Sequence, residues 1–451
     1  MDCEAIILAA GLGTRMRSGL PKVLHLLGGR PMLTWSVAAC RQATGRPPYV
    51  VVGPEGETVR PAVGDEALFI EQRERLGTGH AVLQARPHLR GKSGLVLVVN
   101  ADMALVQAET LRRTIEIQEA NPGPITLLAA ISNSPRGFGR VVRGEDGDIR
   151  EIVEEAHATP EQLAIGELNS SIYCFRGAWL WDHVSQLPLS PKGEYYLTDL
   201  VAMAAREGGR VAWLHTDDPD ELIGINNRLH LAEAEAALRR RINRGWMLAG
   251  VTLVDPQTTY ISPEAELGAD TVLLPNTHIE GRTVIGGSCR VGPNAIVRDS
   301  VLGNGCKVEA SVVEGAVIDD GADIGPFSHL RRGAHLMEDV HVGNFGEVKD
   351  STLGPGTKMG HFSYVGDASI GAGVNIGAGT ITCNFGRDGK KQRTEVGDGA
   401  FIGSDTLLVA PVRLGRRAVT GAGSVVTKDI PDDSLAVGLP ARVIRKLDPG
   451  D

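Results

Sequence analysis

A six-residue repeat in the last quarter of the chain constrains its fold more than any other feature of the sequence. A period of six matches neither the 3.6-residue turn of an α-helix nor the two-residue alternation of a strand, so it indicates a repeat architecture. The repeat has three parts, which are an aliphatic or threonine ladder, glycines after four of its members, and small residues four positions after successive members: Val396, Ile402, Leu408, Leu414, Thr420 and Val426; Gly397, Gly403, Gly415 and Gly421; Ala400, Thr406, Val412, Ala418 and Ser424. The pattern predicts a parallel β-helix, a triangular prism with one inward side chain per hexad and small residues at its corners.

The same ladder is predicted to occupy about residues 251–442. Its earlier inward positions form four runs: Ile285, Val291 and Val297; Ile318, Ile324, Leu330, Leu336, Val342 and Val348; Leu353, Met359 and Val365; Ile370, Ile376 and Thr382. Steps of five residues before Leu353 and Ile370 are expected where a corner loses one residue. The step of fourteen from Thr382 to Val396 predicts a loop that leaves the prism. Loops on rigid scaffolds often carry function.

The size and charge of the chain limit its class. Its 451 residues predict two or three domains, and its net charge of −9 offers no broad cationic field to nucleic acid or an anionic membrane. Six cysteines without Cys-x-x-Cys spacing predict buried thiols rather than a zinc site or disulfides. The acidic start (Met1-Asp2-Cys3-Glu4) and the absence of a long apolar run predict a cytoplasmic protein with no signal peptide or membrane insertion.

The first half of the sequence alternates strand and helix patterns. Buried strands are predicted at Glu4–Ala9, Tyr49–Val52, Ala67–Ile70 and Leu95–Val99, with helices such as 31–43 and 108–120 between some of them. This order predicts a largely parallel, Rossmann-like α/β sheet whose ligands lie beyond the carboxyl ends of its strands. We therefore expect an α/β domain over 1–225, a connecting helix over 226–250 and the β-helix domain over 251–451.

The first strand runs into a segment suited to phosphate. The segment reads Leu8-Ala9-Ala10-Gly11-Leu12-Gly13-Thr14-Arg15-Met16, with Pro21-Lys22 after it. Small residues allow the backbone to approach a phosphate, and successive N–H groups can cradle it. It is not a P-loop, which needs Gly-Lys-Ser/Thr, and Met16 replaces the third glycine of the dinucleotide fingerprint. An ordinary strand-to-helix turn is the alternative, against which Arg15 and Lys22 weigh. Asp102, at the same sheet edge, is either a magnesium ligand beside a triphosphate or a helix cap.

Polar side chains fall on outward positions of the predicted prism. His361 comes two positions after the inward Met359, and Arg331 and Lys349 directly follow inward residues, while Tyr364 and Asn375 end their hexads. Residues at these positions cannot be core, and they recur at successive levels. Taken one at a time, each is more simply a solvated residue.

Three motifs resemble those of the sugar-1-phosphate nucleotidylyltransferases. They are Gly11-x-Gly13-Thr14-Arg15-Met16 with Pro21-Lys22, Gln72 with Leu76-Gly77-Thr78-Gly79-His80-Ala81, and Gly193-Glu194-Tyr195-Tyr196-Leu197-Thr198-Asp199. Joined to a hexapeptide repeat, nearly the whole chain is similar to the bifunctional enzymes that make UDP-N-acetylglucosamine. The resemblance implies a left-handed β-helix and two reactions. These are acetyl transfer from acetyl-CoA to glucosamine-1-phosphate, and uridylyl transfer from UTP to N-acetylglucosamine-1-phosphate with release of diphosphate.

The resemblance also implies roles in the α/β domain. The nucleotide and sugar-nucleotide residues would be Leu8, Ala9, Ala10, Gly11, Lys22, Gln72, Gly77, Thr78, Asn100, Ala101, Asp102, Gly139, Glu154, Asn169 and Asn226. Of these, Asp102 and Asn226 would hold Mg²⁺, and Gly139, Glu154 and Asn169 would bind the N-acetylglucosamine part. Arg15 and Lys22 would be catalytic, because cations offset the repulsion between a sugar phosphate and UTP. The sequence departs from the family at Asn100-Ala101, where Tyr-Gly is usual.

In the β-helix the resemblance makes His361 the general base that deprotonates the glucosamine amine, with Glu347 orienting it. Arg331, Lys349, Tyr364 and Asn375 would bind glucosamine-1-phosphate. Residues matching the acetyl-CoA groove are Ala378, Asn384, Phe385, Ser404, Ala422 and Arg442, with Phe385 in place of the usual tyrosine. Lys391 in the extruded loop would meet a neighbour's sugar site. Three flat faces predict a homotrimer with interfacial sites.

Two other functions compete with this one. The first is a single-activity sugar-1-phosphate nucleotidylyltransferase whose β-helix only oligomerises or senses a ligand. The second is a scaffold protein with an inactive transferase. Asp102, Lys22 and Arg15 argue against the scaffold, and the joint outward placement of His361, Lys349 and their neighbours argues against the single activity.

Overall fold

The computed structural model describes residues 2–132 and 137–446 and divides into two compact units, Met1–Leu238 and Arg239–Asp451. The predicted domains extend over a few residues that lie outside the described ones, namely 1, 133–136 and 447–451. Among the described residues, every helix is too short or too polar to span a lipid bilayer.

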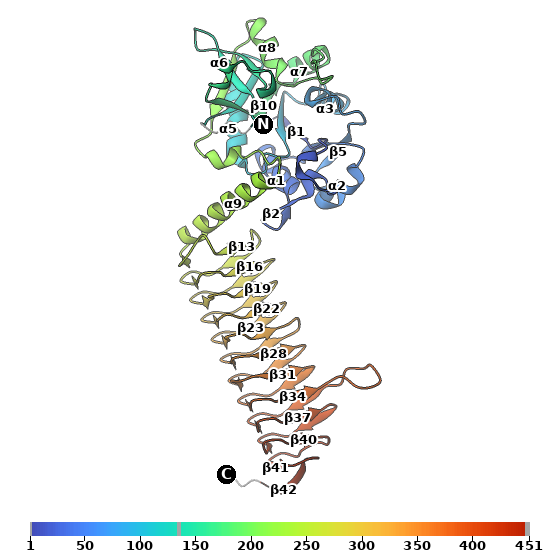
Figure 1. Cartoon of the computed structure of the whole chain (residues 1–451), viewed down its shortest axis with the longest axis vertical. Coiled ribbons are helices and arrows are strands. Elements are labelled where there is room, and N and C mark those ends of the chain that lie inside the picture. The colour runs from blue at the N-terminus through green and yellow to red at the C-terminus, as the bar shows by residue number, and fades with distance from the viewer. Residues whose placement is uncertain (1, 133–136, 447–451) are drawn as a thin grey trace. The chain divides into compact units, whose positions relative to one another are not determined.

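The first unit is built on one mixed sheet (Figure 1). The main path of the sheet runs β11–β7–β10–β6–β1–β4–β5, and β8 and β9 extend it beside β10. The antiparallel strand on that path is β10, and the neighbours among β6, β1, β4 and β5 are parallel, as are β7 and β11. The strands are β1 (Cys3–Leu8), β4 (Tyr49–Val52), β5 (Leu68–Glu71), β6 (Leu95–Asn100), β7 (Ile125–Ile131), β8 (Arg140–Arg143), β9 (Ile149–Val153), β10 (Glu167–Arg176) and β11 (Val211–His215), with a separate hairpin of β2 (Leu26–Leu27) and β3 (Arg30–Pro31). The four predicted strands lie within one residue of their observed bounds.

Helices cover both faces of this sheet. Alternate side chains of β1 point to opposite faces, so Ala5 and Ile7 join one core cluster and Ile6 joins the other. The helices α1, α2 and α5 pack on the first face, and α3, α4, α7 and α8 pack on the second. The helices are α1 (Met32–Thr44), α2 (Gly56–Val63), α3 (Thr78–Gln84), α4 (Arg86–Leu89), α5 (Ala108–Ala120), α6 (Pro160–Leu163), α7 (Gly177–His183), α8 (Asp199–Arg206) and α9 (Arg228–Leu248). The predicted connecting helix corresponds to α9.

The order of strands indicates where a ligand is expected to bind. From β1 the chain crosses to β4 on one side, and β6 joins β1 on the other, with Leu8 opposite Asn100 in the register. A crevice forms at such a reversal, beyond the carboxyl ends of the parallel strands. The segment after Leu8 and the segment after Asn100 therefore meet at one edge of the sheet.

The second unit is a left-handed parallel β-helix with three faces, as predicted (Figure 1). Face one consists of β12 (Thr252–Leu253), β15 (Val272–Leu273), β18 (Arg290–Val291), β21 (Lys307–Val308), β24 (Asp323–Ile324), β27 (His341–Val342), β30 (Lys358–Met359), β33 (Asn375–Ile376), β36 (Phe401–Ile402), β39 (Val419–Thr420), β41 (Ser434–Val437) and β42 (Arg442–Lys446). Face two consists of β13 (Tyr260–Ile261), β16 (His278–Glu280), β19 (Ile296–Arg298), β22 (Val312–Glu314), β25 (His329–Leu330), β28 (Gly346–Lys349), β31 (Ser363–Gly366), β34 (Ile381–Cys383), β37 (Leu407–Val409) and β40 (Val425–Val426). Face three consists of β14 (Glu266–Leu267), β17 (Val284–Ile285), β20 (Val301–Leu302), β23 (Val317–Ile318), β26 (His335–Leu336), β29 (Thr352–Leu353), β32 (Ala368–Ile370), β35 (Thr394–Val396) and β38 (Val412–Leu414).

Every inward position that the six-residue count predicted is buried, and together these side chains form the core of the prism. The polar members of the ladder, Thr382 and Thr420, are each 1% exposed, and they hydrogen-bond to the backbone of neighbouring coils. The residues at the predicted corner positions, from Ala400 to Ser424, are also buried, each 4% exposed or less. Ile242 and Trp246 of α9 pack against this core.

The predicted irregular steps lie at one corner of the prism, which we call the second corner. It joins a face-two strand to the next face-three strand, and it contains the steps 348–353, 365–370 and 382–396. The longest step extrudes the loop 384–393, which projects from the prism in Figure 1 and is closed by a bridge between Phe385 and Lys391. We call the corner that joins face one to face two the first corner.

Candidate active sites

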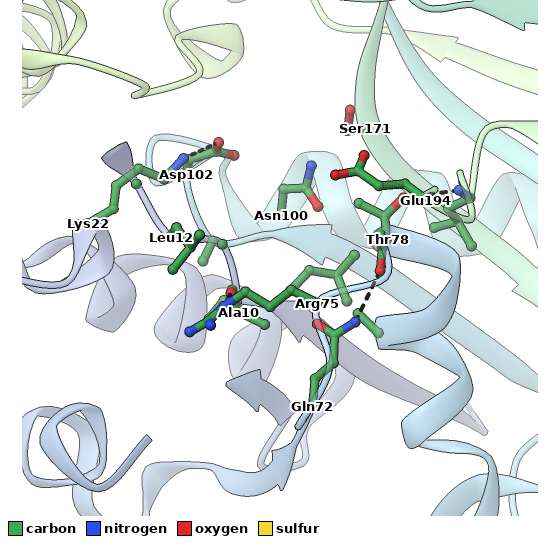
Figure 2. A pocket seen from close by; sticks show the side chains of 18 of the residues that line it. Ala10, Leu12, Lys22, Gln72, Arg75, Thr78, Asn100, Asp102, Ser171 and Glu194 are labelled. Carbon is green, nitrogen blue, oxygen red and sulfur yellow. Dashed lines mark hydrogen bonds and ion pairs between the residues drawn. The ribbon is translucent and has the colours of Figure 1, made fainter. Parts of the chain in front are cut away.

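A cavity of about 640 Å³ lies where the sheet order reverses in the first unit (Figure 2). Its wall is formed by the segments that follow β1, β5 and β6, together with parts of β10 and the loop before α8. Most of the nucleotide-site residues expected from the sequence line it: Leu8, Ala9, Ala10, Gly11, Arg15, Lys22, Gln72, Gly77, Thr78, Asn100, Ala101, Asp102, Glu154 and Asn226. Side chains from distant parts of the sequence therefore converge on one cavity.

The phosphate segment has the backbone that its glycines predict. Gly13 has a φ of +62°, and a Cβ at this position would lie 2.6 Å from Cβ of Lys22. Glycine is therefore needed here both for the left-handed backbone and for the close approach of Lys22. A Cβ on Gly11 would meet nothing within 4 Å, so this part of the segment borders open space.

Lys22 connects the two residues expected to bind the metal. Its Nζ lies 2.7 Å from Oδ2 of Asp102 and 3.2 Å from Oδ1 of Asn226, and Arg15 donates to the same Asn226 oxygen at 2.9 Å. Both oxygens point at one cation, which is the arrangement that a divalent metal with few protein ligands needs. Within residues 2–132 and 137–446, no cluster of three or more His, Cys, Asp or Glu side chains could hold a metal. A metal at Asp102 and Asn226 would take its other ligands from substrate and water.

The second and third sequence motifs lie side by side in the cavity wall. The N–H of Gly79 donates to the carbonyl of Tyr195, and the N–H of Tyr195 donates to that of Leu76, both at 2.8 Å. Gly77 has a φ of +97°, and a Cβ there would lie 2.6 Å from the Tyr195 carbonyl oxygen. Gln72, 2% exposed, donates to the Gly77 carbonyl at 3.2 Å, which fixes the orientation of its amide in the cavity wall.

Of the three residues expected to bind the sugar, one lines the cavity and two lie behind its wall. Glu154 lines the cavity and accepts a hydrogen bond from Thr198 at 3.2 Å. Gly139 and Asn169 are not among the lining residues of this cavity in the described chain. The N–H of Asn169 donates to the Gly139 carbonyl, and the Asn169 amide donates to the hydroxyl of Tyr173, which does line the cavity. A direct contact of Gly139 and Asn169 with sugar stays a prediction.

Burial raises the pKa of the Glu154 carboxyl above its ordinary value, although the hydrogen bond from Thr198 opposes this shift. The folded protein therefore binds this proton more tightly than the unfolded chain does. As the pH rises from the ordinary Glu value of about 4.3 through the raised value, the native state has to ionise a buried carboxyl and loses stability. Glu154→Gln is expected to remove this loss.

Chemical denaturation of the wild type and of Glu154→Gln at several pH values checks this prediction. The variant should gain stability relative to the wild type as the pH rises from the ordinary Glu pKa through the raised pKa of Glu154. A difference in unfolding free energy that does not depend on pH would contradict it.

Several lining residues were not expected from the sequence: Leu12, Arg75, Ser171, Tyr173, Glu194, Tyr196, Leu197 and Thr198. Four of these, Glu194 and Tyr196 to Thr198, belong to the third motif, so the motif could have indicated them. Ser171 lies in a β-bulge of β10 with a φ of +59°, and its sequence carries no signal for either feature. Arg75 stands inside the second motif without being part of its pattern.

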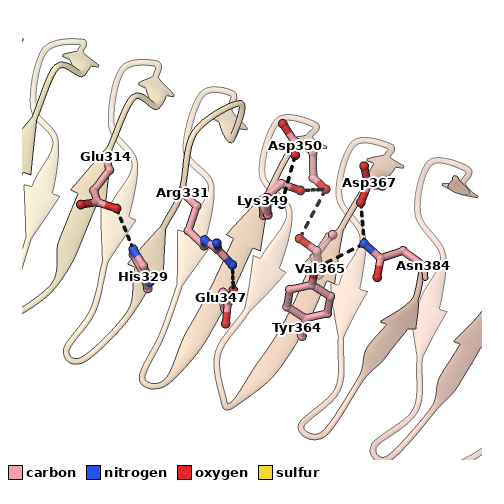
Figure 3. Close-up of polar contacts among 12 residues, drawn as sticks. Glu314, His329, Arg331, Glu347, Lys349, Asp350, Tyr364, Val365, Asp367 and Asn384 are labelled. Atoms are coloured by element: carbon pink, nitrogen blue, oxygen red, sulfur yellow. Dashed lines mark hydrogen bonds and ion pairs between the residues drawn. The ribbon is translucent and has the colours of Figure 1, made fainter. Parts of the chain in front are cut away.

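In the β-helix, polar side chains occupy face two and the second corner (Figure 3). Arg331 donates to the Glu347 carboxylate at 2.8 Å, and Glu347 lies beside Tyr364 in the strand register. Glu347 is thus engaged by Arg331 in the single chain, and its predicted action on His361 stays a prediction. Asn384, 8% exposed, donates to the hydroxyl of Tyr364 at 3.3 Å and to the Asp367 carboxylate.

The extruded loop returns a lysine to its own prism. Nζ of Lys391 lies 3.4 Å from the carboxylate of Asp350 and 3.6 Å from that of Asp367. Lys349 pairs with the same Asp350 at 3.7 Å, and its contact with Lys391 lowers the pKa of Lys349. The sequence suggested Lys391 as a contact with a neighbour's site, whereas in the single chain Lys391 adds charge beside Lys349.

The first corner carries another set of expected residues. His361, Ala378, Ser404 and Ala422 each come two positions after the last residue of a face-one strand, in four consecutive coils. His361, Ser404 and Ala422 are exposed. His361, Ala378, Ser404 and Ala422 form a column along the prism, which we call the first-corner column. Three other expected residues lie elsewhere, with Asn375 on face one, Phe385 exposed in the extruded loop and Arg442 at the start of the closing strand β42.

All six cysteines are unpaired thiols, five of them buried and Cys383 partly buried, as predicted. Ala101, which replaces the usual glycine, is 1% exposed, and its N–H donates to the Leu8 carbonyl at 3.0 Å. The methyl group is therefore accommodated without loss of the contact between the ends of β1 and β6.

The fold and the cavity of the first unit define a nucleotidyltransferase, and the second unit has the hexapeptide β-helix of acyltransferases. The profile of the MobA-like NTP transferase domain matches residues 5–159. Relatives named bifunctional protein GlmU match nearly the whole chain. The relative from Heliobacterium modesticaldum is 47% identical over 96% of this chain and 94% of its own length. That from Pelobacter propionicus is 45% identical over 99% and 97%, and that from Geobacter metallireducens 46% identical over 98% and 97%. The chain belongs to the GlmU family.

Membership in this bifunctional family over the full chain confirms the prediction of an enzyme with two activities, a uridylyltransferase and a glucosamine-1-phosphate acetyltransferase. No finding favours the single-activity alternative. The substrates are therefore small molecules, and the nucleotidyl transfer belongs to a generally metal-dependent class.

Proposed function

We propose that this chain acetylates glucosamine-1-phosphate on its β-helix and then joins the product to UTP in its first unit, releasing UDP-N-acetylglucosamine and diphosphate. Residues 1–225 carry uridylyl transfer, 226–250 connect the two parts, and 251–451 carry acetyl transfer. The observation that carries the proposal is the convergence of Lys22, Asp102 and Asn226 within 3.2 Å at the reversal of the sheet. These residues match the family signature and offer both a cation and metal-binding oxygens.

In uridylyl transfer, a phosphate oxygen of N-acetylglucosamine-1-phosphate attacks the α-phosphorus of UTP. A P–O bond forms to the sugar phosphate, and the bond between the α-phosphorus and the bridging oxygen breaks, so diphosphate leaves. Both reactants are anions, so the site has to offset their repulsion and align them. Lys22 and Arg15 supply positive charge at the phosphates, while Gln72, Gly77 and Thr78 hold uracil. Mg²⁺ bound by Asp102 and Asn226 would supply further charge neutralisation.

In acetyl transfer, the amine of glucosamine-1-phosphate has to lose a proton before it can attack the thioester. His361 accepts that proton, the nitrogen bonds to the acetyl carbon, and the C–S bond breaks. The acylated nitrogen then loses a second proton to become the amide, and the departing sulfur of CoA takes up one proton and leaves as the thiol. Arg331 and Lys349 hold the phosphate of the sugar, and Tyr364 and Asn375 hold the sugar itself. The acetyl-CoA groove runs along Ala378, Ser404 and Ala422 of the first-corner column and includes Asn384, Phe385 and Arg442. Glu347 orients and polarises the imidazole of His361.

We propose that the active form is a cytoplasmic homotrimer with acetyl-transfer sites between subunits. Exposed aromatic side chains on the first corner support self-association, since large exposed apolar side chains mark interaction surfaces. Phe327 and Phe345 are 61% and 59% exposed, and their rings stack at 5.6 Å. The unpaired cysteines and the expected use of UTP and acetyl-CoA support the cytoplasmic location. Recovery of the native chain in a membrane or secreted fraction would argue against that location.

A coupled assay tests the function. Glucosamine-1-phosphate, acetyl-CoA, UTP and Mg²⁺ are incubated with the enzyme, and free thiol and UDP-sugar are followed separately. We expect thiol release to precede UDP-N-acetylglucosamine, and light scattering of the same sample to give a trimer. UDP-sugar formed from pre-acetylated substrate without any thiol release would contradict the acetyl-transfer half. A monomer that acetylates at full rate would contradict the interfacial site.

A further inference from the structure

Arg75 links three segments at the wall of the nucleotide cavity (Figure 2). Its Nε donates to the carbonyl oxygen of Ala10 at 2.7 Å, and its Nη2 pairs with the carboxylate of Glu55. The guanidinium also passes so close to Gly53 that a Cβ there would lie 2.4 Å from Nη2. These contacts come from the segments that follow β1, β4 and β5. One side chain therefore ties together the carboxyl ends of three adjacent parallel strands.

The contact with Ala10 has a consequence for the next N–H group. The carbonyl of Ala10 and the N–H of Gly11 belong to one planar trans peptide unit, so they point in opposite directions. By holding the carbonyl, Arg75 directs the N–H of Gly11 away from the guanidinium. Within the described chain no group accepts a hydrogen bond from this N–H, and a Cβ on Gly11 would border open space. The N–H of Gly11 is thus free for a ligand, and its orientation is fixed.

The charge on Arg75 is already engaged. The carboxylate of Glu55 neutralises one edge of the guanidinium, and Nε donates its hydrogen bond to the Ala10 carbonyl. The side chain is therefore suited to holding its neighbours in position rather than to neutralising phosphate itself. By contrast, Lys22 and Arg15 contact the metal-site oxygens of Asp102 and Asn226.

We propose that Arg75 is a positioning residue for the UTP phosphates, acting through the Ala10–Gly11 peptide and held in place by Glu55. The proposal rests on the proposed function, in which Ala10 and Gly11 contact the nucleotide. Its ligand is the phosphate chain of the nucleotide, not the base or the sugar phosphate. Arg75 therefore affects the affinity for nucleoside phosphates and leaves the affinity for the nucleoside alone unchanged.

Calorimetric binding of uridine and of UTP to the full-length chain tests this inference. Arg75→Gln and Arg75→Lys should weaken UTP binding by about tenfold to a hundredfold, because the hydrogen bond from a charged group to the Ala10 carbonyl is lost or weakened. The loss should be smaller for lysine, which keeps the positive charge but reaches the carbonyl less well. Glu55→Gln should weaken UTP binding less. Uridine should bind all three variants as it binds the wild type, which also shows that the cavity is folded.

Arg73→Gln provides a matched control. Arg73 lies two residues earlier, its side chain is 82% exposed, and it pairs only loosely with Glu71 at 3.9 Å. This variant should bind both ligands normally. In steady-state assays, the Arg75 variants should raise KM for UTP and leave KM for N-acetylglucosamine-1-phosphate and the rate of acetyl transfer unchanged.

Two results would overturn the inference. Unchanged UTP binding in both Arg75 variants would show that the Ala10–Gly11 peptide does not depend on this side chain. Equal losses for uridine and UTP in Arg75→Lys and Glu55→Gln would show that the defect is not specific for phosphate. Failure of the proposed function is separate, because it would appear as wild-type enzyme that makes no UDP-sugar.

Discussion

Asp102→Ala is expected to abolish uridylyl transfer while acetyl transfer continues at its normal rate. The carboxylate is one of two oxygens proposed for the metal, and it also lies 2.7 Å from Nζ of Lys22. Its removal takes away the metal ligand and the partner that positions the lysine. Since the attacking and leaving groups are anionic, we expect the rate of UDP-sugar synthesis to fall by about a thousandfold or more.

The measurement is the rate of UDP-sugar synthesis from pre-acetylated substrate, with thiol release from acetyl-CoA as the internal reference. Binding of Mn²⁺ in the presence of UTP gives a second readout that does not depend on turnover. Asp182→Ala is a suitable control, since Asp182 is 59% exposed and pairs with Arg90 away from the nucleotide cavity. Near-normal UDP-sugar synthesis by Asp102→Ala would rule out the metal assignment.

His361→Ala is expected to make UDP-N-acetylglucosamine only when it receives the pre-acetylated sugar phosphate. The imidazole is the group proposed to take the proton of the amine, and the loss of a general base lowers the rate by about a hundredfold to ten-thousandfold. His341→Ala is the matched control. His341 lies on face one of the preceding coil and pairs with Asp323 at 3.3 Å.

The assay follows free thiol for acetyl transfer and diphosphate release for uridylyl transfer in each variant. Equal thiol release by His361→Ala and His341→Ala would show that His361 is not the base. A parallel loss of diphosphate release would instead indicate that the substitution damages the whole chain.

The fold could be predicted in most of its detail because its signals are local. In the β-helix, burial depends on position within six residues, so counting alone separated the inward Met359 from the outward His361, and the structure confirms both. The extruded loop was predicted for the same reason, because a step of fourteen positions from Thr382 to Val396 cannot fit one face of the prism. In the first unit, apolar runs bounded by turns located β1, β4, β5 and β6.

The parts of the sites that could not be predicted depend on contacts between distant segments. Lys22 and Asn226 are 204 positions apart, and no periodicity in either segment shows that they share a hydrogen bond. Arg75 lacked a signal because its partners follow two other strands. Lys391 reaches Lys349 because the extruded loop folds back on its own prism, and the path of a loop is not encoded in the repeat that it interrupts.

The first-corner column also has a regular spacing along the prism. Its members recur once per coil, and coils of a parallel sheet are about 4.8 Å apart, so a ligand lying along the column meets side chains at fixed intervals. Removing one hexad would turn every later residue onto another face of the prism. Removing a complete coil would keep each residue on its face and would move the later residues along the prism by the height of one coil. Extra sequence can therefore enter without disturbing this spacing only as a whole coil or as an outward loop. Residues 384–393 leave the prism as such a loop.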